Sequence, residues 1–257
     1  MALSAQCRRQ ESSVSPFPIT PAPYYNYLSQ PSENPMDIHQ IIRSKRKTLS
    51  IEIKPDGRLI VRAPKAATDT QIRDMVAAKA DWIHKTRARL SRQYPNLQPK
   101  TFTPGDKFWF LGEQYPLKLT NRQRPLLDLD GTFQLSRAAQ DRARAVFIEW
   151  YREETRAITQ RLIQAYTKQY GFRVRQVRIT SARTRWGSCS SKHTLNFTYR
   201  LCMAPLSIIE YVVIHELVHL KIHNHSKTFW SAVGEIDPDY QAHRAWLKRN
   251  GPRLTLD

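Results

Sequence analysis

The sequence predicts an α+β fold, in which β-hairpins and helices occupy separate stretches and one buried helix packs on a β-sheet. Apolar and polar residues alternate around three glycine-containing turns, a pattern typical of hairpins: Asp56-Gly57, Gly112 and Asp130-Gly131. Two further stretches carry apolar residues at helical spacing. The segment 205–223 is apolar on nearly every side, so we expect its helix to be buried.

Residues 36–136 are predicted to form a small N-terminal α/β subdomain. It begins with the hairpin at Asp56-Gly57 and continues with a helix that Thr68 or Thr70 caps. The other two hairpins complete it. The preceding residues 1–35 hold six of the sixteen prolines and only four charged residues, a composition that predicts a disordered tail. Patterned sequence begins at Met36, as it would if the start codon were assigned too far upstream.

Residues 137–257 are predicted to form the second domain. A long helix over 138–170 ends at Gly171, which is typical of the residue after a helix. An Arg-rich strand over 172–186 and a hairpin turning at 190–193 follow, and Pro205 fits the first turn of the buried helix. A further helix is expected after Ser226, whose hydroxyl suits an N-cap, and a last one over about 238–250.

The chain is strongly basic. Lys and Arg outnumber Asp and Glu by 41 to 22, which gives a net charge of +19. Such a charge favours a polyanionic partner, for example a nucleic acid, a nucleotide or an anionic membrane surface. A basic surface that is only solvated is an equally good interpretation. Nothing in the sequence indicates the oligomeric state.

The three cysteines are too scattered for a disulfide framework, so a reducing compartment is expected: Cys7, Cys189 and Cys202. No apolar run approaches the roughly 20 residues that a membrane span needs. The N-terminus lacks the apolar core of a signal peptide. These features predict a cytoplasmic protein.

The segment HELVHLKIHNH, residues 215–225, carries the strongest chemical signal. His215 and His219 form an H-E-x-x-H motif, and positions four apart share one helix face, so both imidazoles can reach one Zn²⁺. Glu216 lies beside them and can act as a general base toward a water molecule. Two unpaired histidines and a carboxylate would be costly inside an apolar helix, and a metal removes that cost. We therefore predict one zinc ion per chain, although other divalent metals suit the same ligands.

A catalytic zinc site needs a third protein ligand. His223 is excluded on a continuous helix, because it lies about 12 Å along the axis from His215 at 1.5 Å per residue. Asn224 tolerates the left-handed conformation that ends helices, so we expect a break there. His225 then folds back toward the metal as the third ligand.

Other residues stay open as alternatives. Glu235 and His243 are weaker candidates for a ligand from a distant helix, and His223 is expected at the surface or near the ligands. Arg185, expected on the strand before the buried helix, is a candidate for stabilising an oxyanion or a phosphate in a substrate site, and Asn196 is a second candidate there.

Several segments together resemble the YgjP-like metallopeptidase family, a relative of the SprT-like zincins. RWGSCSSKHTLNFTYRL and IEYVVIHELVHLKIHNHSKTFW carry the likeness, and upstream segments such as FLGEQYPLKL extend it over about residues 40–250. The resemblance implies a zincin-like catalytic domain behind a smaller N-terminal part. It also implies metal ligands at His215, His219 and His225.

The leading hypothesis is a zinc-dependent hydrolase that acts on a peptide or protein substrate, with Glu216 as general base. An alternative hydrolase would cleave a nucleotide phosphoanhydride, with Arg-rich strands holding the phosphates, since no Walker-type glycine loop is present. A third hypothesis is a nucleic-acid-binding module with a structural metal, although structural zinc sites usually have four ligands. A DNA-associated protease, recruited through its basic surface, would combine these features.

Overall fold

The computed structural model describes residues 37–95, 97 and 99–256, so the tail predicted at 1–35 lies outside the described residues. Helices and strands occupy separate stretches, which confirms the predicted α+β class. The strands are β1 (Ile38–Ser44), β2 (Ser50–Ile53), β3 (Leu59–Pro64), β4 (Lys107–Phe110), β5 (Glu113–Thr120), β6 (Leu127–Asp130), β7 (Thr132–Ser136), β8 (Gln176–Thr180), β9 (Gly187–Cys189) and β10 (Thr194–Thr198). The α-helices are α1 (Asp69–Ala78), α2 (Ala80–Gln93), α3 (Ala143–Tyr170), α4 (Leu206–Val218), α5 (Lys227–Ile236) and α6 (Tyr240–Asn250). Short 3₁₀ turns cover Arg137–Arg142, Tyr199–Met203 and Gly251–Arg253.

The N-terminal part, which runs from β1 to the end of α2, is a three-stranded sheet with two helices. The strand order is β1-β3-β2, with β1 parallel and β2 antiparallel to β3, and the β2–β3 hairpin turns at Asp56-Gly57 as predicted. Thr68, and not Thr70, caps α1, in a capping box with Gln71. The stretch predicted as one helix is two helices that meet at Lys79. A small core of its own holds this part together: Leu59, Val61, Ala63, Ile72, Val76 and Ile83.

A four-stranded sheet of order β4-β5-β7-β6 packs against the start of α3. Its two hairpins turn at Gly112 and Gly131, as predicted. Phe108 of β4 stacks on Phe147 of α3 with ring centroids 4.2 Å apart, and both are fully buried. This sheet therefore shares the main core with the C-terminal half of the chain. The domain boundary at residue 136 stays a prediction. The buried residues between 102 and 135 pack in the main core, with the C-terminal half of the chain.

The third sheet, of order β8-β10-β9, supports the buried helix. Leu195 and Phe197 of β10 are fully buried and face the core, in which most of α4 is also buried. The Arg-rich strand is shorter than predicted, because β8 ends at Thr180 and β9 begins only at Gly187. Before this sheet, α3 ends at Gly171 with φ 68°, as its predicted role requires.

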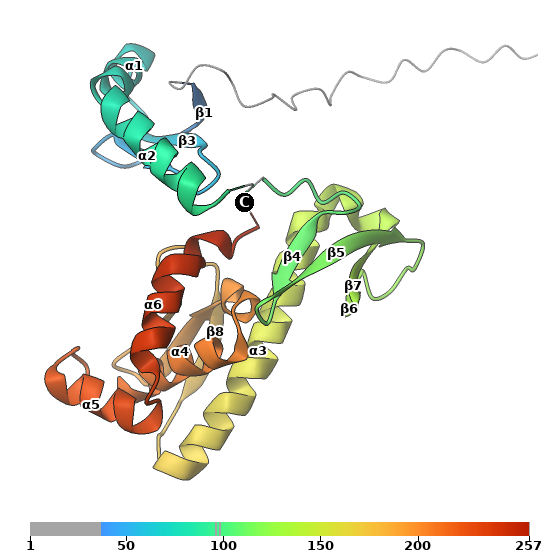
Figure 1. The fold of residues 1–257 in the computed structure, drawn as a ribbon, viewed down its shortest axis with the longest axis vertical. Helices are drawn as coiled ribbons and strands as arrows, with labels where there is room; N and C mark the ends of the chain where they lie inside the picture. The colour runs from blue at the N-terminus through green and yellow to red at the C-terminus, as the bar shows by residue number, and fades with distance from the viewer. Residues whose placement is uncertain (1–36, 96, 98, 257) are drawn as a thin grey trace, which may run out of the picture.

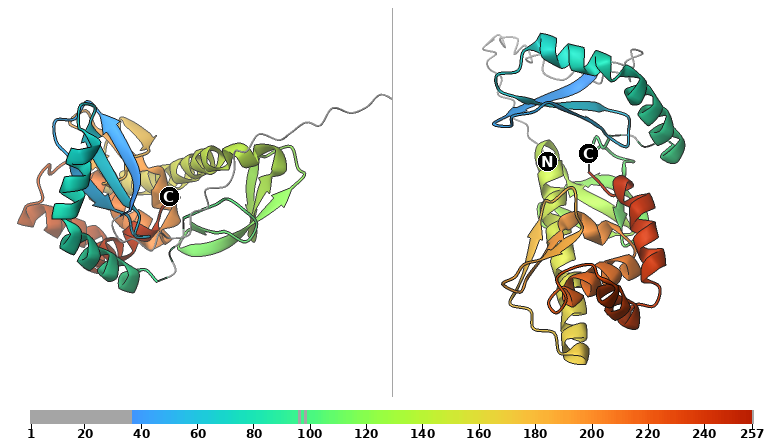
Figure 2. Two further views of the ribbon diagram at one scale, coloured as in Figure 1. Left: turned by 90° about the horizontal axis from the view of Figure 1, so that it is seen from above. Right: turned by 90° about the vertical axis from the view of Figure 1, so that its left-hand side faces the viewer.

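The N-terminal part lies apart from the main body, and α6 and the C-terminal end of the chain lie where the two parts meet (Figures 1 and 2). Tyr94, just after α2, donates a hydrogen bond of 3.1 Å to the carbonyl oxygen of Arg249 in α6. Cys202 is fully buried, and Cys189 is partly buried in the same core. Of the helices in the described ranges, none combines the length and the apolar character that crossing a membrane requires.

Candidate metal centre

The last turn of α4 presents His215 and Glu216, and His219 follows as its C-cap residue. Most residues of α4 are apolar and nine residues are buried, so packing in the core stabilises the helix. Pro205 is the N-cap residue, so it lies just before the first turn and not in it as predicted. The i, i+4 spacing puts the two imidazoles on one face, with ring centroids 4.8 Å apart.

The helix ends earlier than the sequence predicted. We expected a break at Asn224, but α4 ends at Val218, and Asn224 has no positive φ. The chain instead tightens through i→i−3 bonds, from the Leu220 N–H to the Leu217 carbonyl and from the Lys221 N–H to the Val218 carbonyl. Such 3₁₀ turns are a common way to finish an α-helix, and no left-handed residue is needed.

His225 returns to the end of α4 as expected. The next residue, Ser226, is the N-cap of α5, and its hydroxyl accepts a hydrogen bond from the Phe229 N–H at 3.4 Å. This cap fixes the direction in which the chain enters α5, so His225 is held at the turn between the two helices.

The three imidazoles converge on one point. Nε2 of His225 lies 3.1 Å from Nε2 of His215 and 3.2 Å from Nε2 of His219. Zn–N bonds of about 2.0–2.1 Å at tetrahedral angles put ligand nitrogens about 3.3 Å apart. Three imidazole nitrogens that approach one another this closely fit a divalent metal, which would accept their lone pairs.

The ring nitrogens that face away from the centre differ between His219 and His215. Nδ1 of His219 lies 3.0 Å from the Ile222 carbonyl oxygen. A carbonyl only accepts, so Nδ1 carries the proton and the Nε2 lone pair of the neutral ring faces the other histidines. In contrast, Nδ1 of His215 is buried with no hydrogen-bond partner among the described residues.

Burial favours the neutral imidazoles that bind metals. Burial lowers the pKa of His215 to about 3, and the charges of the neighbouring histidines and of Arg244 act in the same direction. Burial also lowers the pKa of His219, against which its hydrogen bond to Ile222 acts. Neutral histidine is the form that coordinates metal, so the lowered pKa values of His215 and His219 suit metal binding.

The first turn of α5 supplies an aromatic wall for the site. Phe229 stacks on His219 with centroids 4.4 Å apart and meets the edges of the other two imidazoles. Trp230 stacks on His225 at 5.6 Å and on Tyr240 at 5.4 Å. These rings limit rotation of the imidazoles and exclude water from one side of the centre.

Glu216 lies beside the histidines and is only 5% exposed. Burial raises the pKa of its carboxyl to about 8, and the positive charge of Arg185 opposes this shift. Its Oε2 atom is buried without a hydrogen-bond partner in the part of the chain that the structure describes. A buried carboxyl that lacks a partner is suited to take up a proton from a substrate or a water molecule.

Gly187 of β9 makes room for this carboxylate. A Cβ atom added there would lie 2.5 Å from Oε1 of Glu216 and 2.8 Å from its Cδ. The strand backbone and the carboxylate therefore touch, and no larger residue fits without displacing one of them.

We expect Gly187→Ala to displace the Glu216 carboxylate and lower hydrolytic activity by about 100-fold, since misplacement near 1 Å costs that much. Overpacking should also cost about 1–3 kcal/mol of stability. Turnover and thermal unfolding would be measured together. The control is Gly234→Ala, whose added Cβ would meet a Tyr240 side-chain atom at 3.3 Å. Equal activity in the two variants would contradict the role of Gly187.

The structure does not bring all predicted site residues together. Asn196 lies on the face of β10 opposite to Leu195 and Phe197, and its amide donates to the Ser188 carbonyl at 3.3 Å. Arg185 is exposed in the segment before β9, not on the strand, yet its charge acts on Glu216.

The other ligand candidates lie elsewhere. Within the described ranges, the cluster able to hold a metal contains the three histidines, and neither Glu235 nor His243 belongs to it. Glu235 is exposed, and Nδ1 of His243 pairs with Asp237 at 2.9 Å. His223 is exposed, as expected.

The sequence pattern did not indicate that Phe229, Trp230 and Tyr211 lie beside the three histidines. Tyr211 lies one turn before His215, with ring centroids 6.0 Å apart. The available signal was spacing, because residues four and five after His225 fall in the first turn of the next helix. Neighbouring aromatics are common in any core, so spacing alone could not separate them from ordinary packing.

Three converging imidazoles beside a buried glutamate are typical of metal-dependent hydrolases. A comparison with protein-family models matches the YgjP-like metallopeptidase domain over residues 47–250. Because this match covers most of the chain, the chain belongs to the YgjP-like metallopeptidase family. A search of curated proteins and a search of solved structures found no match.

Proposed function

We propose that this protein is a zinc-dependent peptidase with a zincin-like active site, in which His215, His219 and His225 hold the metal and Glu216 is the general base. The observation that carries the proposal is the convergence of three Nε2 atoms, at 3.1 and 3.2 Å, beside a buried carboxyl. Membership of a metallopeptidase family supports the same reaction class.

The bound metal would act as a Lewis acid toward the scissile carbonyl and lower the pKa of water. Glu216 then accepts a proton on its carboxylate from the attacking water and passes it to the leaving amine. Phe229 and Trp230 keep the imidazoles in place and exclude bulk water from their side. Arg185, whose charge acts on Glu216, would stabilise negative charge on the carbonyl oxygen.

The edge of the sheet beside Glu216 favours a peptide as the substrate. In the described sheet β9 is an edge strand, paired with β10 on one side, and Gly187 in β9 touches Glu216. An extended peptide could add to this edge through main-chain hydrogen bonds, which would carry its scissile bond past the glutamate. A nucleotide would gain nothing from such an edge.

The test uses the full chain after chelation of its metals. We expect the apo protein to lose cleavage of an unstructured protein substrate, and one equivalent of zinc to restore it. Panels of peptides and of nucleoside triphosphates would be assayed side by side. Zinc-dependent release of phosphate or pyrophosphate without peptide cleavage would replace the peptidase with a phosphoanhydride hydrolase. Full activity of the chelated protein on peptides would contradict a metal-dependent reaction.

A further inference from the structure

A cleft lies between the N-terminal part and the main body, away from the three histidines. It has a volume of about 400 Å³. One wall is the turn between β2 and β3, and the other is formed by the segment before β9 and by the end of α6. The charged residues of its lining are Glu52, Lys54, Asp56, Arg58, Arg183, Arg200 and Lys248.

A second cavity of about 330 Å³ continues the first. The two share Lys54, Arg58 and Arg183 in their linings, so they form one groove. The second cavity adds Arg62 of β3 and Arg144 of α3. We call the joined cavities the basic cleft.

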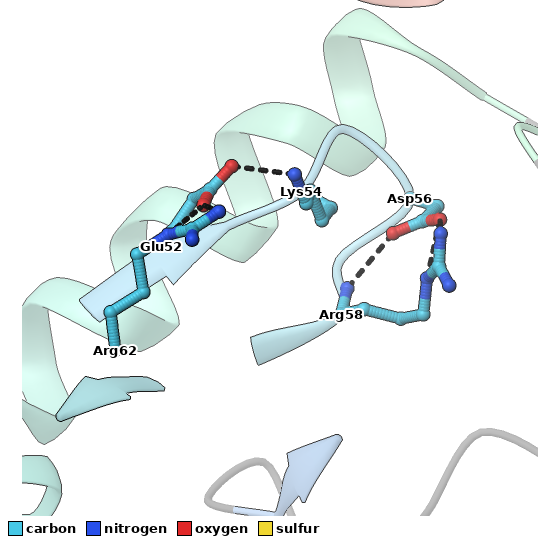
Figure 3. A network of polar contacts seen from close by, with 5 residues as sticks. All are labelled: Glu52, Lys54, Asp56, Arg58 and Arg62. Carbon is cyan, nitrogen blue, oxygen red and sulfur yellow. Dashed lines mark hydrogen bonds and ion pairs between the residues drawn. The ribbon is translucent and has the colours of Figure 1, made fainter. Parts of the chain in front are cut away.

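Seven cationic side chains and two acidic ones line the basic cleft. The two acids are already engaged (Figure 3): Glu52 pairs with Lys54 at 2.6 Å and with Arg62 at 3.2 Å, and Asp56 pairs with Arg58 at 2.7 Å. These ion pairs fix the cations of one wall in position. The excess positive charge lies between low-dielectric walls, which focus the field on an anion in the cleft.

The chemistry of the lining favours phosphates that are joined in a strand. Five of the seven cations are arginines, whose forked guanidinium groups suit phosphate oxygens. They are spread over two joined cavities, not gathered around one point. Trp186 also lines the cleft, with the Arg200 guanidinium 4.7 Å from its ring centroid, and aromatic side chains are platforms for nucleobases. The cleft is too small to enclose a duplex, which carries two backbones, whereas its volume suits a few nucleotides of one strand.

We propose that the basic cleft binds the backbone of a single nucleic-acid strand. This site is separate from the peptidase centre, and its failure would leave the proposed peptidase unaffected. The two are adjacent in the chain, because Trp186 in the cleft precedes Gly187, which touches Glu216. A strand held in the cleft would therefore bring proteins bound to that nucleic acid near the active centre.

The test measures fluorescence anisotropy of a labelled single strand of about 20 nucleotides with the full chain at several salt concentrations. If about four phosphates are neutralised, affinity should fall about 50-fold between 50 and 200 mM salt, from a slope of about −0.7 per contact. The triple variant Arg58→Gln, Arg183→Gln, Lys248→Gln should bind at least about tenfold more weakly and flatten the slope by about 2.

The matched control removes three exposed cations that lie outside the cleft lining: Arg73→Gln, Lys118→Gln and Arg161→Gln. Its net charge equals that of the cleft variant, and its affinity should stay within about twofold of the wild type. A loss equal to that of the cleft variant would overturn the proposal in favour of general charge attraction.

A single pair of variants keeps the test decisive if the triple variant does not fold. Lys248→Glu should weaken binding several-fold, whereas Arg249→Glu, the next exposed residue of α6, should not, because Arg249 lies outside the lining. Competition completes the test with two probes. Displacement of the strand by polyglutamate or by a nucleoside triphosphate, at equal charge concentration, would overturn recognition of a strand.

Discussion

Glu216→Gln should retain about one zinc per chain and lose 100- to 10,000-fold in turnover, the usual contribution of a general base. The amide has nearly the same shape as the carboxyl, so the close contact with Gly187 is kept, but it cannot accept the proton. Because Glu216 is buried beside the histidines and is not one of the three converging donors, its loss should not release the metal.

The measurement is steady-state peptide cleavage together with metal content by mass spectrometry. Glu210→Gln is the matched control on the same helix, since Glu210 accepts a 2.6 Å hydrogen bond from the Tyr166 hydroxyl and a glutamine oxygen accepts it equally well. The control should cleave at the wild-type rate. Substantial activity in Glu216→Gln would assign the base to another residue and contradict the proposed mechanism.

His225→Ala should lower zinc affinity by well over 100-fold, because loss of a residue that only supports a ligand already costs 10- to 100-fold. His225 is the imidazole that lies within 3.2 Å of both others. The imidazoles of His215 and His219 would remain and would hold the ion weakly, with two positions open to water. Activity should fall in step with bound metal and recover partly at high zinc concentration.

His223→Ala is the control for this experiment. His223 lies two residues away in the same turn, is exposed, and is outside the converging cluster. Zinc titrations of both variants by competition with a chelating dye would be compared, with circular dichroism to verify that α5 still forms. Equal affinities would show that His225 is not a ligand and would overturn the three-histidine site.

The spacing of the histidines predicted their convergence, but not the way the chain achieves it. A continuous helix would separate His215 from His223 by about 12 Å, and on that ground the sequence excluded His223. Because α4 ends at Val218, it is the folded turn that leaves His223 exposed and outside the cluster. The predicted location of the helix end was wrong, because the prediction relied on Asn224 to end the helix. No residue type in HLKIHNH announces a stop at Val218, and the 3₁₀ bonds that end α4 depend on its packing.

By itself, the sequence determined the features that depend on local pattern. Alternating residues with glycine turns determined the hairpins, and a segment apolar on nearly every side determined the buried helix. Ser226 determined the start of α5, and the i, i+4 spacing determined the shared face of His215 and His219. Each of these needs only neighbours within a few residues.

Only the tertiary structure decided the features that join distant segments. It placed Gly187 against Glu216, the first turn of α5 against the imidazoles, and the β2–β3 turn opposite α6 to form the basic cleft. Such contacts depend on how elements pack, and many different packings are compatible with one periodic pattern. Burial of Glu216 is likewise a property of the assembled core, so its raised pKa could not be inferred from the sequence alone.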